Sequence, residues 1–265
     1  MKFDFKDGVF IGVVGVILFI VVVFVYMNGD GFLTGYSNII QFFVALGTMS
    51  SVIVALRLSY KNNKKDTYER NFSMLLEQHN SHMYHLLKDT RVFYNNLGTV
   101  LGWGNDRCTW SLNDANQELH KLDYYYGSYF RVLYRLLRHI DENYYLCSLD
   151  KKKFYSGVVR SFLNPELTFL LAVNISHAKE DGQYYKYKIL VEKFSFLEHL
   201  ILDGEKFISS LPSDSGMNWE PFDRPCDNGV SPLKMIDEIC LVFERIAFGK
   251  NEHISIYEKV LEKNS

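Results

Sequence analysis

Two long apolar runs dominate the first sixty residues, and a short polar segment separates them. The first run, residues 9–27, contains no charged and no strongly polar side chain. A helix of this length rises about 28 Å, close to the thickness of the hydrocarbon core of a bilayer. A secretory signal peptide would have a shorter apolar stretch and a cleavage site, and a buried strand would be shorter still. The pattern therefore predicts a transmembrane helix.

The second run, within residues 37–58, is less uniform and predicts a second transmembrane helix. Small and polar residues recur on one face of it at spacings of three and four. This polar stripe consists of Ser37, Gln41, Ala45 and Thr48, continued by Ser51 or Val52 and by Ala55. Gly8, Gly12 and Gly15 form a thin strip on the first helix. The stripe is either a contact face for that strip or, in an oligomer, the lining of a water path.

Basic residues predict how this hairpin is oriented. Lys2 and Lys6 precede the first run, and the polar turn at 28–35 contains neither Lys nor Arg. Four basic residues, Arg57, Lys61, Lys64 and Lys65, follow the second run. The positive-inside rule therefore places both ends of the chain in the cytoplasm and the turn outside.

The rest of the chain reads as helical, because four of its five prolines lie between 212 and 232. The predicted fold class is all-α: a transmembrane hairpin at 1–58, a juxtamembrane helix at 59–90, and a cytosolic helical domain at 91–265 with an irregular loop at 211–232. Helices are expected from a Ser111-x-x-Asp114 capping box to about Ile140, over Asp150–Leu163, from Asn164-Pro165-Glu166 onward, over about 181–202, from Ser231-Pro232 to Gly249, and briefly within 250–262.

An apolar stripe on the juxtamembrane helix predicts a packed face. It consists of Phe72, Leu76, His79, Met83 and Leu86, which follow a heptad-like spacing. Packing within the chain is favoured, and packing on a second copy is the alternative.

The residues that carry chemistry form no recognisable active site. A net charge of −2 gives no basic excess for nucleic-acid binding, and the four cysteines (Cys108, Cys147, Cys226, Cys240) lack CxxC spacing. His79, His82 and His85 have no carboxylate at a fixed spacing for a metal, and no GxSxG, HExxH or phosphate-loop pattern occurs. We therefore expect that the protein is not an enzyme and binds no metal or cofactor. A catalytic triad assembled from distant residues would not be visible in the spacing of sequence motifs.

Residues 123–141 contain the most distinctive helix. Tyr126, Phe130, Leu133 or Tyr134, and Leu137 form its apolar stripe, and Arg131, Arg135 and Arg138 lie on an adjacent face. Arg135 and Arg138 are expected to be solvated or paired with Asp123 and Asp141. Arg131 lies between aromatic residues and is expected in a buried ion pair with Glu166 or another carboxylate.

This helix also carries a family resemblance. The chain reads FSMLLEQHN at 72–80, YFRVLYRLLRHID at 129–141 and YSGVVRSFLNPELTFLLAVN at 155–174. These segments resemble the motifs of the putative phage abortive infection proteins (AbiC-like), over about residues 60–210. Ten motif positions carry over as structural positions: Tyr129, Phe130, Arg131, Tyr134, Arg160, Ser161, Leu163, Glu166, Leu167 and Asn174. At position 165 this chain has proline, where the family often has another residue. Pro165 is expected only to define the first residue of the helix more sharply.

The resemblance implies a bacterial inner-membrane protein of anti-phage defence. The first hypothesis is an effector whose cytosolic domain senses infection, or is restrained by a regulatory protein or nucleoprotein encoded nearby, and whose hairpins oligomerise and breach the membrane. The second is a membrane-tethered module that captures a phage or host component. A membrane-anchored RNase is the third and least favoured. Membrane lipid and further copies of the chain are the expected partners, without direct nucleic-acid binding.

Overall fold

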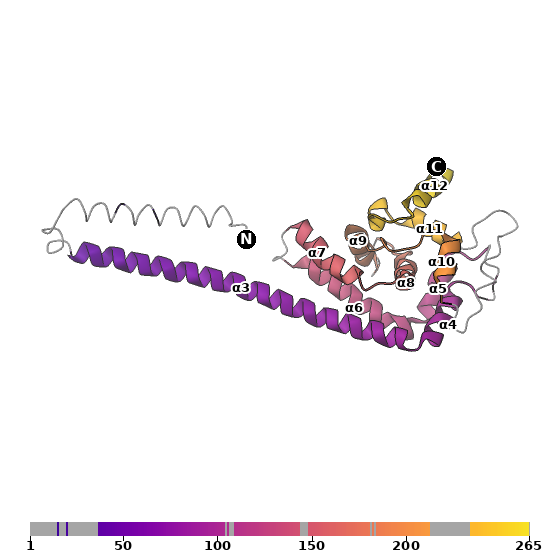
Figure 1. Ribbon diagram of the computed structural model, residues 1–265, viewed down its shortest axis with the longest axis horizontal. Helices are drawn as coiled ribbons and strands as arrows, with labels where there is room; N and C mark the ends of the chain where they lie inside the picture. The colour runs from indigo at the N-terminus through magenta and orange to yellow at the C-terminus, as the bar shows by residue number, and fades with distance from the viewer. Residues whose placement is uncertain are drawn as a thin grey trace. The chain divides into compact units, whose positions relative to one another are not determined.

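In the computed structural model, all regular secondary structure of the described residues is helical, with no strand among them (Figure 1). The structure describes residues 15, 20, 37–103, 105, 109–143, 148–180, 182, 184–212 and 234–264. The helices are α3 (Ser37–Lys88), α4 (Thr90–Val100), α5 (Leu112–Lys121), α6 (Asp123–Glu142), α7 (Leu149–Arg160), α8 (Pro165–Ile175), α9 (Tyr185–Lys193), α10 (Gly204–Ser210), α11 (Lys234–Val242), the 3-10 helix η3 (Arg245–Phe248) and α12 (Ile254–Asn264). The all-α prediction is confirmed for this part of the chain.

The chain divides into two units, Met1–Lys64 and Lys65–Ser265. Of the first predicted membrane helix, Gly15 and Ile20 are described, and both are helical. The remainder of that helix and the turn at 28–35 lie outside the described residues, so the hairpin stays a prediction.

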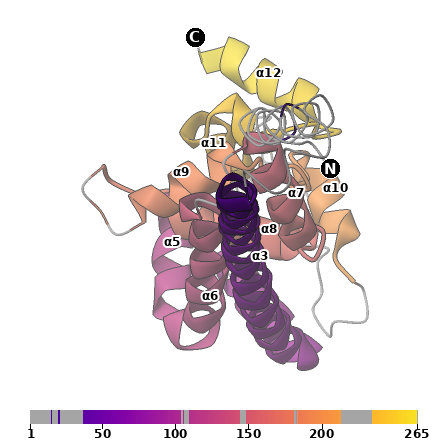
Figure 2. The same ribbon diagram turned by 90° about the vertical axis from the view of Figure 1, so that its left-hand side faces the viewer.

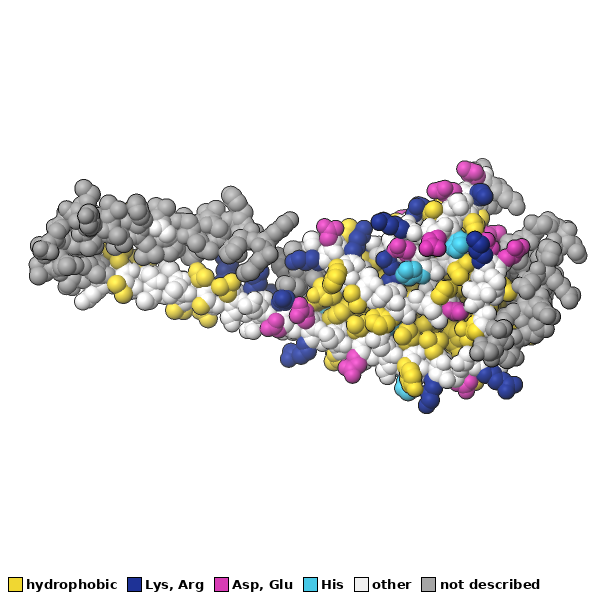
Figure 3. All heavy atoms as spheres, viewed as in Figure 1, with side chains coloured by type: hydrophobic (Ala, Val, Ile, Leu, Met, Phe, Trp, Pro, Cys, Tyr) yellow, Lys and Arg dark blue, Asp and Glu magenta, His cyan; other side chains and the backbone are white. Residues whose placement is uncertain are grey.

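Helix α3 starts at Ser37, where the second membrane helix was predicted, but it continues unbroken for 52 residues to Lys88. The reason is local, because neither Gly nor Pro occurs between Thr48 and Lys88 to interrupt it. The apolar part of α3 is exposed in its own unit, with Val44 at 61%, Met49 at 67% and Leu56 at 64%. Figure 3 shows hydrophobic side chains on the described part of the first unit, with Lys and Arg side chains nearer the second unit's end of α3. By length and composition α3 is able to cross a membrane.

The second half of α3 belongs to the core of the second unit. Phe72, His79 and Leu86 of the predicted stripe are buried, and Leu76 and Met83 pack against the core at partial exposure. Tyr68 stacks on His139 of α6, with ring centroids 4.9 Å apart. The stripe therefore packs within the chain, which is the favoured of the two predictions.

Helix α8 lies among the other helices of the second unit (Figure 2). Its residues 166–175 are all buried. Its start confirms the local prediction. Asn164 caps the helix by accepting a hydrogen bond from the Leu167 N–H at 2.8 Å, and Pro165 occupies the first turn. Asn116 of α5 donates to the Val173 carbonyl at 2.6 Å, which ties α5 to this central helix.

The prediction of one helix from the capping box to Ile140 is wrong in part. The box itself is confirmed, because the Asp114 N–H donates to Ser111 Oγ and the Ser111 N–H donates to Asp114. The helix, however, is interrupted at Leu122, which separates α5 from α6. No sequence breaker stands there. Packing sets the break, because α5 is held on α8 whereas α6 packs along α3 through His79 and Tyr129.

Two further boundaries differ from the predictions. Helix α7 ends at Arg160 rather than Leu163, and the helix expected over 181–202 is only α9, Tyr185–Lys193. After α9 the chain turns at Ser195, whose φ is 54°, and the Leu197 N–H donates to the Ala247 carbonyl.

The C-terminal region differs in how its helix ends. Gly249, with φ of 50°, terminates the 3-10 helix η3 rather than α11, which ends at Val242. The short final helix predicted within 250–262 is present as α12. The predicted start at Ser231-Pro232 and nearly all of the loop at 211–232 lie outside the described residues.

Candidate functional site

The ten motif positions lie on three consecutive helices of the second unit and on the link between two of them. Helix α6 carries Tyr129, Phe130, Arg131 and Tyr134; α7 ends at Arg160, which Ser161 follows; Leu163 precedes α8; and α8 carries Glu166, Leu167 and Asn174. The structure places them in three settings: the hydrophobic core, a polar network around Arg160, and a small cavity.

The core setting contains an internal hydrogen bond between α3 and α6. Tyr129 and His79 are fully buried, and the Tyr129 hydroxyl lies 3.2 Å from His79 Nε2. Burial lowers the pKa of His79, which favours the neutral ring in this position. Leu163 and Leu167 are buried apolar residues, and Ser161 is exposed and bonds to its own helix at the Val158 carbonyl.

Glu166 is a buried carboxyl on the central helix. The Tyr94 hydroxyl of α4 donates to Glu166 Oε1 at 3.3 Å. Burial raises the pKa of Glu166, and the hydrogen bond from Tyr94 opposes that shift only in part.

The prediction that Arg131 forms a buried ion pair, with Glu166 as a candidate partner, is wrong. Arg131 is exposed, and its Nη1 lies 3.4 Å from Oδ2 of the exposed Asp123. Adjacent residues of a helix point about 100° apart, so aromatic neighbours in sequence do not bury Arg131. Arg138 pairs with Glu142 at 2.8 Å, and Asp141 pairs with Lys152 and Lys193 instead of an arginine.

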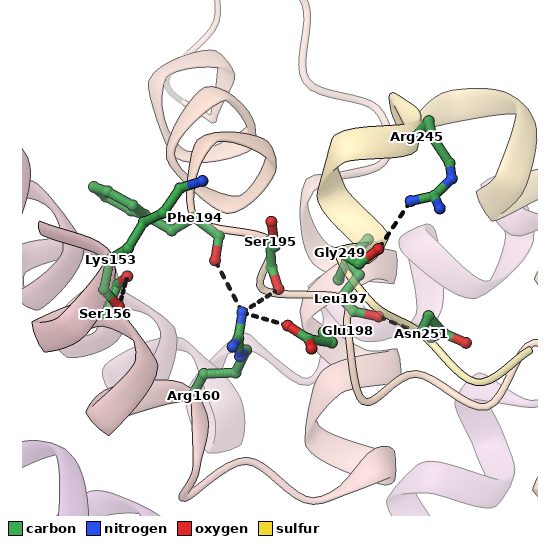
Figure 4. A network of polar contacts seen from close by, with 10 residues as sticks. All are labelled: Lys153, Ser156, Arg160, Phe194, Ser195, Leu197, Glu198, Arg245, Gly249 and Asn251. Atoms are coloured by element: carbon green, nitrogen blue, oxygen red, sulfur yellow. Dashed lines mark hydrogen bonds and ion pairs between the residues drawn. The ribbon is translucent and has the colours of Figure 1, made fainter. Parts of the chain in front are cut away.

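Arg160 joins the end of α7 to the turn after α9 (Figure 4). Its Nη1 lies 2.7 Å from Glu198 Oε2 and donates to the carbonyls of Phe194 and Ser195 at 3.3 and 3.0 Å. Asn251 reinforces the same turn by donating to the carbonyls of Leu197 and Leu200. The Arg160 network therefore holds the sharp turn after α9.

The third setting is a cavity of about 70 Å³, called here the motif cavity. Helix α6 contributes Asp123, Gly127, Phe130, Arg131 and Tyr134; α8 contributes Asn174; and Tyr184 and Tyr187 come from the start and first turn of α9. Four of these eight residues are motif positions. The cavity is the place where the motifs of α6 and α8 meet.

Two polar atoms of the motif cavity lack a hydrogen-bond partner among the described residues. They are Nδ2 of Asn174 and the hydroxyl of Tyr187, on side chains that are 7% and 3% exposed. Burial raises the pKa of Tyr187, so its hydroxyl stays protonated and able to donate. At the rim, the Asp123–Arg131 pair is exposed and spans Gly127.

The residues of the predicted membrane face are only partly described. Gly8 and Gly12 lie outside the described residues, Gly15 is helical, and Ser37 begins α3. Gln41, Ala45 and Thr48 are exposed, and the Thr48 hydroxyl donates to the Ala45 carbonyl at 2.8 Å. Thr48 thus has its hydrogen bond within the helix.

The structure tests the predictions for the cysteines and histidines only in part. Cys240 is a free, buried thiol whose pKa burial raises to about 12, whereas Cys108, Cys147 and Cys226 lie outside the described residues. His79 is buried against Tyr129 while His85 is exposed, so the three histidines of α3 do not converge. In the described ranges no cluster of His, Cys, Asp or Glu is arranged to hold a metal ion.

Comparison with known families gave a match to part of the chain. Residues 121–205 match the family described as "Putative phage abortive infection protein". This segment is similar to that family. It makes up about a third of the chain, and it contains all ten motif positions and all eight residues that line the motif cavity. Comparisons with curated proteins and with solved structures gave no match.

The abortive infection family match confirms the resemblance seen in the sequence, over its central part. Sequence reasoning identified Phe130, Arg131, Tyr134 and Asn174 but missed Asp123, Gly127, Tyr184 and Tyr187. One signal was present, because Asp123, Gly127 and Arg131 are spaced four residues apart and so share a helix face.

Proposed function

We propose that this protein is a membrane-anchored, non-enzymatic effector of anti-phage defence by abortive infection. Similarity of the central segment to the abortive infection family supports a role in defence. One observation supports the membrane mechanism more than any other: α3 is a single helix whose first part is apolar and exposed and whose second part belongs to the core of the cytosolic domain. A change in that domain would therefore act directly on a helix able to enter the bilayer.

In this proposal the hairpin lies in the bacterial inner membrane with both termini in the cytoplasm. Arg57, Lys61, Lys64 and Lys65 on α3 follow the apolar stretch and support that orientation. Alkaline phosphatase, which is active only outside the cytoplasm, tests it. Fused within the turn at 28–35 it should be active, and fused after Lys65 it should be inactive. The reverse pattern would exclude this topology.

The proposed action is assembly of several copies and disruption of the membrane. The exposed polar stripe at Gln41 and Thr48 supports this step, because a Gln in lipid needs a polar partner from another helix or from water. A membrane-potential dye in infected cells tests it. Depolarisation should precede lysis and be lost in a Q41L/T48V double variant, with V44L/M49L as the matched control on α3. Lysis without earlier depolarisation would refute the pore.

A membrane-tethered binding module is the second candidate, and the bonding of Thr48 within its own helix favours it. A hydroxyl that is already satisfied does not require a water path. Exchange of residues 1–58 for an unrelated two-helix anchor separates the two candidates. A tether keeps its protection against phage after the exchange, and a pore-former loses it. In either case we propose that a regulatory partner encoded nearby restrains the protein. Total cellular RNA is expected to stay stable during the response, which would count against a membrane-anchored RNase.

A further inference from the structure

Helix α7 exposes a large apolar side chain on its outer face. Phe154 is 68% exposed, which makes it the most exposed phenylalanine among the side chains that the structure describes, and its ring meets the neighbouring Tyr155 ring edge-on at 5.5 Å. Leu149, at the start of the helix, is 48% exposed. Near Phe154 the surface is open, because a Cβ built on Gly157 would meet no atom within 4 Å. An exposed apolar patch commonly marks a site of interaction with a protein or a membrane.

Two exposed lysines flank Phe154. Lys151 and Lys153 lie on either side of it around the helix. The third lysine of this run, Lys152, is partly buried in an ion pair, and Asp150 is the acidic residue of the helix, so the exposed surface has a positive excess. An apolar centre between cationic side chains is typical of helices that lie on an anionic bilayer. This surface is called here the α7 face, and it consists of Leu149, Lys151, Lys153, Phe154 and Gly157.

Helix α7 packs where the chain enters the second unit. The ring of Tyr155 contacts those of Tyr68 and Phe72 on α3, with centroids 5.1 and 4.9 Å apart. Tyr68 comes three residues after Lys65, the first residue of this unit. Lys65 in turn comes seven residues after Leu58, where the predicted membrane helix ends. Even fully extended, that connection spans at most about 25 Å. The first turns of the second unit therefore stay close to the membrane surface for any conformation of the connection.

The lysines favour a lipid partner over a protein partner for the α7 face. Lysine is depleted in protein–protein interfaces, whereas anionic headgroups attract the lysines and arginines that lie next to a membrane helix. Arg57, Lys61 and Lys64 already form such a basic segment directly before the second unit. The α7 lysines extend this positive surface.

We propose that the α7 face lies on the cytoplasmic surface of the membrane, with Phe154 at the boundary between headgroups and acyl chains and with Lys151 and Lys153 on anionic phospholipids. This inference rests on the proposed anchoring of residues 1–58 and adds a second, peripheral contact that holds the second unit against the bilayer. The anionic lipid content of the membrane then governs how firmly this unit is docked.

Photo-crosslinking of the full-length protein in lipid nanodiscs tests the proposal. The nanodiscs contain phosphatidylcholine alone or together with anionic phosphatidylglycerol. The photoreactive residue p-benzoylphenylalanine replaces Phe154, Tyr124 or Val44, one position at a time, and mass spectrometry detects phospholipid adducts after illumination. We expect adducts at 154 that increase with phosphatidylglycerol. Position 44, on the apolar part of α3, reports on the anchor and should give adducts in both lipids.

Tyr124 is the matched control for an exposed aromatic residue. It is 80% exposed on α6, and it lies near the far end of α3, because the hydroxyl of the adjacent Tyr125 donates to the Leu86 carbonyl at 2.8 Å. We expect no lipid adduct at this position. Equal adduct yields at 124 and 154 would overturn the inference, since they would show that lipid reaches any exposed ring of the unit.

The remaining outcomes separate this inference from the proposed anchor. Adducts at 44 without adducts at 154 would overturn the inference and leave the anchor in place. Absence of adducts at both positions would overturn both. Crosslinking of position 154 to a second copy of the chain instead of lipid would assign the α7 face to an oligomer and overturn the lipid contact.

Charge variants test the role of the lysines. K151Q/K153Q, in the chain that carries the probe at 154, should abolish the increase in adducts caused by phosphatidylglycerol. K186Q/K259Q is the matched control, because it removes two exposed lysines from α9 and α12 and should leave that increase unchanged. Equal loss in both variants would show that overall charge is responsible, and an unchanged increase in K151Q/K153Q would refute headgroup binding by these lysines.

Discussion

Asp123 and Arg131 are paired across Gly127, two turns of α6 apart. Their contact of 3.4 Å is possible because residue 127 has no side chain, and a Cβ built there would lie 2.1 Å from Asp123 Oδ1. Gly127 therefore provides space for this ion pair. It is not needed for an unusual backbone conformation, because the backbone is helical at that point. The rim of the motif cavity depends on a residue that contributes no side-chain atom to it.

The role of Gly127 is testable by a double-mutant cycle. Gly127→Ala alone should change the free energy of unfolding by less than about 1 kcal/mol, because the gain in helix propensity is offset by displacement of Asp123. In the Asp123→Ala background the same change should stabilise by about 1 kcal/mol. Chemical denaturation measures both values, and additive effects would show that Asp123 does not occupy the space above Gly127.

Arg160 should be far less replaceable than the exposed arginines. Arg160→Lys should lower the free energy of unfolding by about 1–3 kcal/mol, since one ammonium does not reproduce its bonds to Glu198 and two carbonyls. Arg138→Lys, in an exposed pair with Glu142, should cost less than about 0.5 kcal/mol. Denaturant titration of the two variants compares them. Equal costs would mean that the Arg160 network does not stabilise the turn after α9.

Glu166 should make stability depend on pH. Because burial raises its pKa in the folded state, its stabilising effect is complete below the unfolded pKa and is lost as pH rises through the folded value. Glu166→Gln should therefore be more stable than the wild type at neutral pH, since Gln can still accept the bond from Tyr94. The advantage should vanish on acidification. Thermal melts across pH, with exposed Glu142→Gln as control, would contradict this if both variants behaved alike.

An unbroken α3 should be required for defence if this helix transmits a change in the second unit to its apolar part. Asn62→Pro interrupts an exposed stretch of α3 just before the core residues begin, at a local cost of about 3 kcal/mol. We expect the variant to remain in the membrane fraction with a folded domain and to lose protection against phage in plating assays. Asn62→Ala is the control. Full protection by Asn62→Pro would show that an unbroken helix is not required.

Local signals predicted those parts of the fold that local chemistry determines. The Ser111 and Asn164 caps, the start of α3 and its buried stripe all follow from patterns within one or two turns. The breaks at Leu122 and after Lys193 do not, because contacts between distant residues set them: Asn116 with Val173, and Leu197 with Ala247.

The candidate site was predictable only in part for the same reason. The motifs pointed to Arg131 and Asn174, but the two donors that lack a partner among the described residues become visible only when three helices are assembled. Arg131 was misplaced because a one-residue step along a helix changes the face, and its aromatic neighbours are buried on another side.

Because the second part of α3 belongs to the core of the second unit, it also determines where the chain can be truncated. Tyr68, Phe72, His79 and Leu86 are core residues of the second unit, although they follow the exposed apolar part of α3 in the same helix. A fragment that starts after residue 90 would leave the α6 face against them uncovered and would aggregate. A fragment that starts at Lys65 keeps them. A fragment that keeps the core of the second unit covered therefore includes α3 from Lys65 to Lys88.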